Sequence, residues 1–242
     1  MSLPEAPAAL RLEMPGESAE YRRRRDELLA AEIALKDQRE RVAALRRSLP
    51  LGGVAKDYRF LEGPADLADD SPSCHETRLS ELFAPGKDEL IVIHYMFAPD
   101  RQQPCPMCTM WADGYNAVAQ HLGDKVNFAL VAKADLAKLR AWARGRGWNR
   151  LRLLSSHDNS FNRDYHMEDE SGAQRPGVSV FVRQPGGEIR HSYTTEASLG
   201  PGHHRGIDLF SPVWNLYDLL PSGRGSWMPR FAYEAAAPPA GR

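Results

Sequence analysis

Two cysteines near the middle of the chain are the residues whose type and spacing are best suited to chemistry. They stand in the motif Cys105-Pro106-Met107-Cys108, which follows the apolar run Ile91–Phe97. This order predicts a strand, a short loop and a helix that begins at the cysteine pair. At a helix start, unpaired backbone N–H groups and the helix dipole stabilise a thiolate, which is the nucleophile in disulfide exchange. The motif therefore predicts redox chemistry, with Cys105 as nucleophile and Cys108, one turn further on, as the residue that resolves the mixed disulfide.

The composition argues against several other classes of protein. Lys and Arg number 31 and Asp and Glu number 32 in the 242 residues, so no overall field attracts nucleic acid or an anionic membrane. Three cysteines are too few for a secreted scaffold held together by disulfides. The first residues carry no basic start followed by an apolar core, and no apolar stretch approaches the length of a membrane span. We therefore expect a cytoplasmic protein that binds neither nucleic acid nor membrane.

A C-x-x-C pair can also be half of a zinc site, which is the weaker interpretation of this motif. A closed structural site needs four well-spaced ligands. The other two would have to come from Cys74, His75, His203 or His204, and no second C-x-x-C exists. Adjacent residues such as Cys74-His75 are a poor chelating pair. We expect no metal and no cofactor, and we interpret Cys74 as an incidental free thiol.

The elements that must position the cysteines alternate between strands and helices. The sequence predicts strands at 57–61, 89–97, 126–132 and 151–155, a hairpin of 177–183 and 188–194, and helices at 110–122, 135–146 and 206–220. This alternation predicts an α/β domain of three layers, which we place at residues 54–233. His94 falls on a buried strand, where we expect a hydrogen-bonded core histidine. Asp113, on the helix after the cysteines, is either a proton acceptor for the resolving thiol or a surface or capping residue.

A long helix precedes this domain. Residues 17–49 contain no Gly or Pro and are rich in Ala, Leu, Glu, Arg and Lys, and Pro50 ends the segment 17–50. Their apolar residues recur at seven-residue steps, at Tyr21, Leu28, Leu35, Val42 and Leu49. So narrow a stripe either packs along the domain or pairs with a second copy in a homodimer through residues 17–49. We expect the ends of the chain, residues 1–16 and 234–242, to be disordered.

The motif and its surroundings resemble the thioredoxin superfamily, in which a C-x-x-C begins a helix and a later proline leads into a hairpin. Arg175-Pro176-Gly177 stands where that superfamily carries its cis-proline strand. The resemblance implies a thioredoxin-like three-layer sandwich, in which helices flank a central mixed sheet, with the long N-terminal helix added. Pro176, if cis, would then lie beside the cysteines and hold an extended substrate segment. Arg175, Pro176 and Trp111 are the predicted substrate-binding residues, with Trp111 in the core or at the lip of the site.

A more specific resemblance covers about residues 20–233. The chain is similar to a bacterial thioredoxin-like family of unknown function that carries a C-P-x-C motif. The segments that carry this similarity are 93–100, 105–114, 136–139, 147–148, 155–156, 159–162 and 176–181. The resemblance implies the fold and a dithiol chemistry, and it implies no particular substrate.

The function that these observations favour is a thiol–disulfide oxidoreductase. Its partner is expected to be a disulfide-containing protein or a small thiol substrate. One alternative is a non-catalytic interaction protein that dimerises through its N-terminal helix. Another is a thiol peroxidase, because the loop 98–104 is longer than in thioredoxin. Peroxiredoxins, however, use the pattern P-x-x-x-[T/S]-x-x-C, and here Ala98 and Gln102 stand at the Pro and Thr positions.

Overall fold

The computed structural model describes residues 13–233 of the chain. The ends that we predict to be disordered lie outside these residues, apart from residues 13–16. The chain divides into two compact units, with the division between Pro50 and Leu51. Within the described residues, no helix has both the length and the apolar character needed to cross a membrane.

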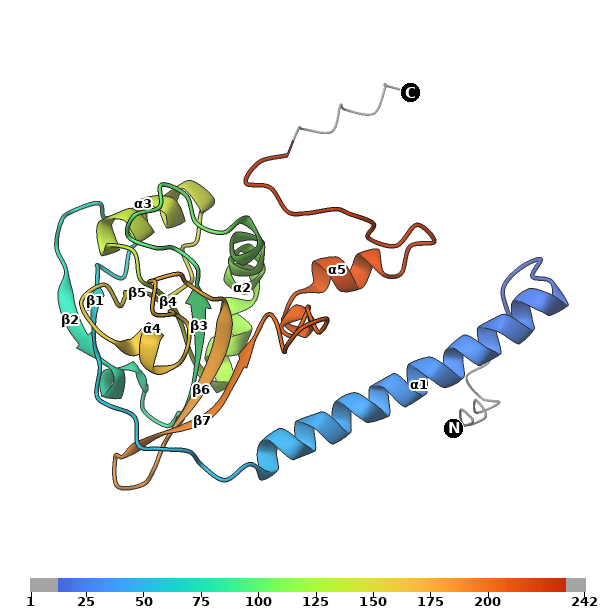
Figure 1. The fold of residues 1–242 in the computed structure, drawn as a ribbon, viewed down its shortest axis with the longest axis horizontal. Helices are drawn as coiled ribbons and strands as arrows, with labels where there is room; N and C mark the ends of the chain where they lie inside the picture. Colours follow the sequence, from blue (N-terminus) through green and yellow to red (C-terminus); the bar gives the residue numbers. More distant parts are fainter. Residues whose placement is uncertain (1–12, 234–242) are drawn as a thin grey trace. The chain divides into compact units, whose positions relative to one another are not determined.

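The first unit is built on one long helix, α1 (Ala19–Ser48) (Figure 1). The Ser18 side chain accepts a hydrogen bond from the backbone N–H of Tyr21 at 3.1 Å, and such an N-cap is worth about 1 kcal/mol. Arg23 pairs with Glu20 one turn before it and with Glu27 one turn after it. Exposed pairs of this kind add only about 0.3–0.5 kcal/mol each. The predicted long helix is confirmed, with bounds within two residues of the expected ones.

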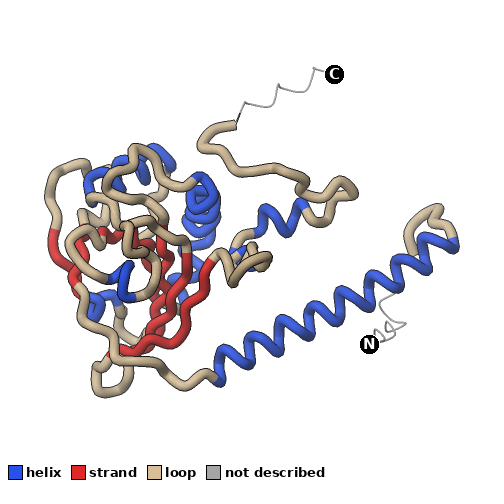
Figure 2. Tube along the Cα trace, in the orientation of Figure 1, coloured by secondary structure: helices blue, strands red, loops and turns tan. Residues whose placement is uncertain are grey.

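The second unit contains one seven-stranded mixed sheet (Figure 2). Its strand order is β2-β1-β5-β4-β3-β6-β7. The neighbours β5, β4 and β3 run parallel, and every other pairing is antiparallel. The strands are β1 (Arg59–Glu62), β2 (His75–Arg78), β3 (Glu89–Tyr95), β4 (Asn127–Ala132), β5 (Leu153–Ser155), β6 (Gly177–Arg183) and β7 (Ile189–Glu196).

Helices cover both faces of this sheet, so the predicted thioredoxin-like three-layer fold is confirmed. The helices are α2 (Pro106–Lys125), α3 (Leu136–Arg146), α4 (Phe161–Asp164) and α5 (Pro212–Tyr217), with the 3₁₀ turns η2 (Leu79–Leu82) and η3 (Asp208–Phe210). Side chains alternate along β3, as they must on a pleated strand. Ile93 and Tyr95 join the core beneath α2 and α3. Leu90 and Val92 join the opposite core, against η2 and Phe161 of α4.

One predicted element needs correction, and one observed strand was not predicted. The single helix expected at 206–220 is broken into η3 and α5, because Ser211 is extended and Pro212 begins a new helix. Proline has no N–H to continue a preceding helix and is favoured at a first helical position. Strand β2 was not predicted, since His75–Arg78 is polar and buries only Thr77.

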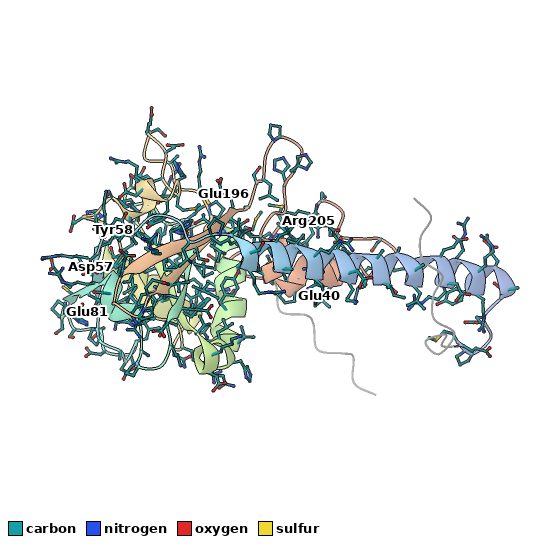
Figure 3. All side chains as sticks on the ribbon, turned by 90° about the horizontal axis from the view of Figure 1, so that it is seen from below. Glu40, Asp57, Tyr58, Glu81, Glu196 and Arg205 are labelled. Carbon is teal, nitrogen blue, oxygen red and sulfur yellow. The ribbon has the colours of Figure 1, made fainter. Side chains whose placement is uncertain are left out.

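The turn η2 is held by the side chain of Asp57, which precedes β1, and by that of its own residue Glu81. Asp57 accepts a hydrogen bond from the backbone N–H of Ser80 at 2.9 Å, and Glu81 accepts one from the N–H of Arg78 at 2.7 Å. Figure 3 shows Asp57 and Glu81 together at this end of the unit. These bonds satisfy N–H groups that a short helical turn leaves without partners.

Candidate active site

The loop between β3 and α2 carries the cysteine motif. Cys105 is the N-cap residue of α2, and Pro106 occupies the first helical position, where its missing N–H costs nothing. The backbone N–H of Cys105 donates to the carbonyl oxygen of Met96 at 3.0 Å. That bond returns the chain to the end of β3 after the loop. The predicted order of strand, loop and helix start is confirmed.

The two thiols differ in burial and in proton affinity. Both are free; Cys105 is half-buried and Cys108 is buried. A hydrogen bond from the Cys108 thiol lowers the pKa of Cys105 to about 6; the backbone N–H groups of Cys108 and Met107 add to this, and burial opposes it. The same thiol–thiol hydrogen bond, together with burial, raises the pKa of Cys108. Near neutral pH, Cys105 is therefore the thiolate and Cys108 keeps its proton.

Two hydroxyl groups fix the first turn of α2 to the central strand. The Thr109 hydroxyl donates to the carbonyl oxygen of Cys105 at 2.9 Å and lies 2.8 Å from the hydroxyl of Tyr95. Both residues are buried. Tyr95 also packs edge-on against Trp148, with ring centroids 5.5 Å apart. The position of Cys105 relative to β3 thus depends on buried contacts and not on the loop alone.

Cys105 lines a cavity of about 740 Å³. The walls come from the loop 98–104, from Lys133 after β4, and from the segment 168–174. Four charged residues are among the lining residues: Asp100, Arg101, Lys133 and Glu168. The cavity therefore presents a nucleophilic thiol to a polar volume within the range of small-molecule sites.

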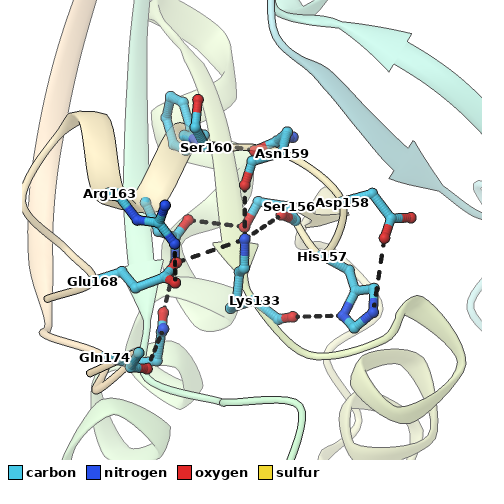
Figure 4. A network of polar contacts seen from close by, with 12 residues as sticks. Lys133, Ser156, His157, Asp158, Asn159, Ser160, Arg163, Glu168 and Gln174 are labelled. Atoms are coloured by element: carbon cyan, nitrogen blue, oxygen red, sulfur yellow. Dashed lines mark hydrogen bonds and ion pairs between the residues drawn. The ribbon is translucent and has the colours of Figure 1, made fainter. Parts of the chain in front are cut away.

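Lys133 and Glu168, which both line this cavity, form a buried ion pair, and Figure 4 shows it within a network of polar contacts. The Lys133 ammonium lies 3.6 Å from Oε2 of Glu168, and the two side chains are 15% and 6% exposed. Lys133 also donates to the carbonyl oxygens of Ser156 and Asn159, at 3.2 and 2.7 Å. Arg163, which is largely exposed, approaches Oε1 of Glu168 at 3.4 Å.

A chain of hydrogen bonds supports the segment that carries Glu168. The Ser156 hydroxyl donates to Asn162, whose amide donates to the side-chain oxygen of Gln174, each at 2.8 Å. Gln174 pairs with Glu168 in an isolated β-bridge. Ser156 and Asn162 belong to the sequence segments that suggested the specific family resemblance, and the structure gives them this supporting role.

The family of the chain follows from its sequence as a whole. The family described as "Bacterial protein of unknown function (DUF899)" matches residues 12–235. The chain belongs to this family. Its membership agrees with the resemblance to a bacterial family of unknown function. No curated protein matches the chain.

Among solved structures, the DUF899 chain is similar to peroxiredoxins. With the mitochondrial 2-Cys peroxiredoxin from Plasmodium falciparum it shares 13% identity over 70% of this chain and 95% of that one, with a TM-score of 0.47. With Enterococcus faecalis AhpC the identity is 14%, over 74% and 98% of the two chains, with a TM-score of 0.45. With the reduced 2-Cys peroxiredoxin of Plasmodium vivax it is 14%, over 60% and 84%, with a TM-score of 0.44.

The three predicted substrate-binding residues are not among those that line the cavity of Cys105 in the DUF899 chain. Trp111 is buried and lines a second cavity of about 370 Å³, together with Met107 of the motif. Arg175 and Pro176 line a third cavity of about 490 Å³. Residues 13–233 contain no cis peptide bond, so Pro176 is trans. Substrate binding by these residues remains a prediction.

Two other residues singled out in the sequence have structural partners. Asp113 accepts a hydrogen bond from the indole N–H of Trp148 at 2.8 Å and pairs with Arg146, so it is engaged away from the thiols. His94 is a buried, hydrogen-bonded core histidine, as predicted, with Nε2 2.8 Å from the Ser179 hydroxyl. Burial lowers the pKa of His94 to about 3, so its ring is neutral.

The ligands that a zinc site would need do not come together. No group of three or more His, Cys, Asp or Glu side chains that could hold a metal ion occurs in the part of the chain that the structure describes. Cys74 is an exposed free thiol, and His203 and His204 lie on an exposed loop.

Lys133 and Glu168 were not among the predicted site residues. The sequence did contain a signal for Lys133, because this residue directly follows β4, which runs parallel to β3. The carboxyl ends of parallel strands meet at one edge of a sheet, and the cysteine motif follows β3 at that same edge. Glu168 carried no such signal, because it lies in an irregular segment between elements.

Proposed function

We propose that this protein is a thiol–disulfide oxidoreductase that uses Cys105 and Cys108. The observation that supports this most is the unequal pair of thiols at the start of α2. Cys105 borders a cavity and has a pKa lowered to about 6, whereas Cys108 is buried with a raised pKa. A thiolate that is accessible and stabilised is the attacking group that disulfide exchange requires.

The reaction proceeds in two exchanges. The Cys105 thiolate attacks one sulfur of a disulfide RS–SR, so that a Cys105–SR bond forms and RS⁻ leaves. Cys108 then loses its proton and attacks the Sγ atom of Cys105, which expels the second RS⁻. The two leaving thiolates take up two protons. The substrate gains two electrons, the cysteine pair loses two, and an external dithiol returns the pair to the reduced state.

The first test is reduction of insulin or of a generic small disulfide with a dithiol donor. The wild-type protein should accelerate it, Cys105→Ser should not, and Cys108→Ser should accumulate the mixed disulfide on Cys105. Equal rates for wild type and Cys105→Ser, toward disulfides and toward peroxides, would favour the non-catalytic interaction protein instead.

A thiol peroxidase is the less supported alternative. The hydroxyl that peroxiredoxins place before their cysteine is missing, because Gln102 stands at that position. Thr109, one turn after Cys105, gives its hydroxyl proton to the carbonyl oxygen of Cys105 and not to the thiol. Peroxide consumption that depends on Cys105 and exceeds the disulfide activity would reverse this preference.

A further inference from the structure

The charges around Cys105 are balanced. Arg101 and Lys133 contribute two cations to the cavity wall, and Asp100 and Glu168 contribute two anions. A cavity with one sign of charge attracts a ligand of the opposite sign. A cavity with both signs best accommodates a ligand that itself carries both.

The four charges are not equally available to a ligand. Lys133 is mostly buried, donates to two backbone carbonyl oxygens and faces Glu168, so its charge is largely compensated by the protein. Arg101 and Asp100 are exposed, line the cavity, and form no ion pair with any residue of the range 13–233. Arg101 is thus the cation, and Asp100 the anion, that are free to meet a ligand.

Glu168, the second anion of the cavity wall, is less available than Asp100. Its Oε2 atom is buried, and the carboxylate is flanked by Lys133 at 3.6 Å and by Arg163 at 3.4 Å. The charge of Glu168 is therefore compensated within the protein, and Asp100 is the anion that a ligand ammonium can reach.

The shape of the cavity also bears on the size of the substrate. The Cys105 thiol lies between two chain segments, 98–104 and 168–174, and the cavity of about 740 Å³ is within the range that encloses small molecules. A disulfide inside a folded protein must bring its surrounding backbone with it. A small disulfide can enter between the two segments alone.

We propose that the substrate of this site is a low-molecular-weight zwitterionic disulfide, of the amino-acid or short-peptide class, with its carboxylate held by Arg101 and its ammonium held by Asp100. This inference rests on the proposed oxidoreductase function. The exchange is the one given above: the dithiol protein and RS–SR yield the protein disulfide and two RSH. No further reactant is needed for one turnover.

The test is a single-turnover oxidation of the pre-reduced full-length protein by four disulfides. Cystine carries both charges, cystamine carries ammonium groups only, 3,3′-dithiodipropionate carries carboxylates only, and bis(2-hydroxyethyl) disulfide is neutral. Quenching with an alkylating reagent and measuring protein mass gives the rate at which the Cys105–Cys108 pair is oxidised. Each rate is divided by the rate of the same disulfide with dithiothreitol at the same pH, which removes differences in intrinsic reactivity.

We expect cystine to give the highest normalised rate of the four, and to exceed insulin. In Arg101→Glu, the ratio of the dithiodipropionate rate to the cystamine rate should fall by at least about tenfold, as reversal of one partly solvated charge near a ligand charge predicts. The ratio cancels any general effect of the variant on the Cys105 thiolate. Arg150→Glu, which reverses an exposed arginine outside the cavity lining, should leave the ratio unchanged.

Three outcomes would overturn the inference or its basis. Equal normalised rates for all four disulfides, with Cys105-dependent oxidation intact, would reject the zwitterionic substrate and leave the oxidoreductase function standing. Faster oxidation by insulin than by cystine would reject a small substrate. No oxidation of wild type by any disulfide would reject the proposed function itself.

Discussion

Cys105 and Cys108 lie one turn apart at the start of α2 and differ in burial: Cys105 is half-buried and lines the cavity, whereas Cys108 is buried. The arrangement assigns the attacking and the resolving role by position. Cys105, at the cavity, carries the negative charge, and Cys108, on the buried face of α2, carries the proton.

Removing the Cys108 thiol should raise the pKa of Cys105, because that thiol is the main group that lowers it. We expect Cys108→Ala to move the pKa from about 6 toward the ordinary cysteine range near 8.5, because only backbone N–H groups would remain to stabilise the thiolate. The measurement is the pH dependence of alkylation of Cys105. Cys74→Ala is the matched control, since Cys74 is exposed and distant in sequence from the motif. This variant should leave the pKa of Cys105 unchanged.

The stability of the reduced protein should rise between about pH 6 and pH 8.5. The pKa of Cys105 is lower in the folded chain than in the unfolded one, so the unfolded chain binds more protons in this window. The contribution is complete above the unfolded pKa and is lost as the pH falls through about 6, with a slope of at most about 1.4 kcal/mol per pH unit.

Cys108 acts in the opposite direction at higher pH. Its raised pKa contributes stability below about pH 8.5, and that stability is lost as the pH rises further.

The contribution of Cys105 can be measured by thermal unfolding. Because Cys105→Ser removes the thiolate, the stabilities of reduced wild type and reduced Cys105→Ser should diverge from pH 6 to pH 8. If the melting temperatures of the two proteins change with pH in the same way over that range, the folded chain does not stabilise the Cys105 thiolate.

Breaking the ion pair on the cavity wall should destabilise the protein strongly. Lys133→Met leaves the Glu168 carboxylate buried with only the exposed Arg163 as a counter-charge, which costs about 3 kcal/mol or more. Chemical denaturation measures the loss. Lys56→Met removes an ammonium that is 70% exposed from its pair with Asp164, and this control should cost less than about 1 kcal/mol. Similar losses for both variants would contradict burial as the cause.

Homodimerisation through residues 17–49 remains a prediction, and α1 offers a direct test of it. Leu28 and Leu35 lie seven residues apart and are 52% and 61% exposed on the single chain. If they form the seam between two copies, Leu28→Glu together with Leu35→Glu should convert a dimer to a monomer in sedimentation equilibrium. Arg39→Glu, at an exposed position of the same helix, should leave the dimer intact. A wild-type protein that sediments as a monomer at all concentrations would contradict the predicted homodimer.

Local sequence signals determined the start of α2 and the extent of α1. Pro106 is favoured at a first helical position, so the helix begins there and Cys105 becomes its N-cap residue. Ser18 supplies a cap for α1, and the run without Gly or Pro carries it to Ser48. Local signals failed where an element is polar, as in β2, or where Pro212 interrupts an otherwise helical pattern.

The cavity, by contrast, was decided by tertiary structure. Lys133 and Glu168 are far apart in sequence, and no local pattern relates the end of β4 to the segment 168–174. They meet because the parallel sheet brings Lys133 to the same edge as Cys105, and because buried hydrogen bonds through Asn162 hold the opposite wall in place. The sequence determined which residue can be the nucleophile, since a helix start acts on its own residues. Only the packed chain determined which charges surround that nucleophile, because those charges come from distant segments.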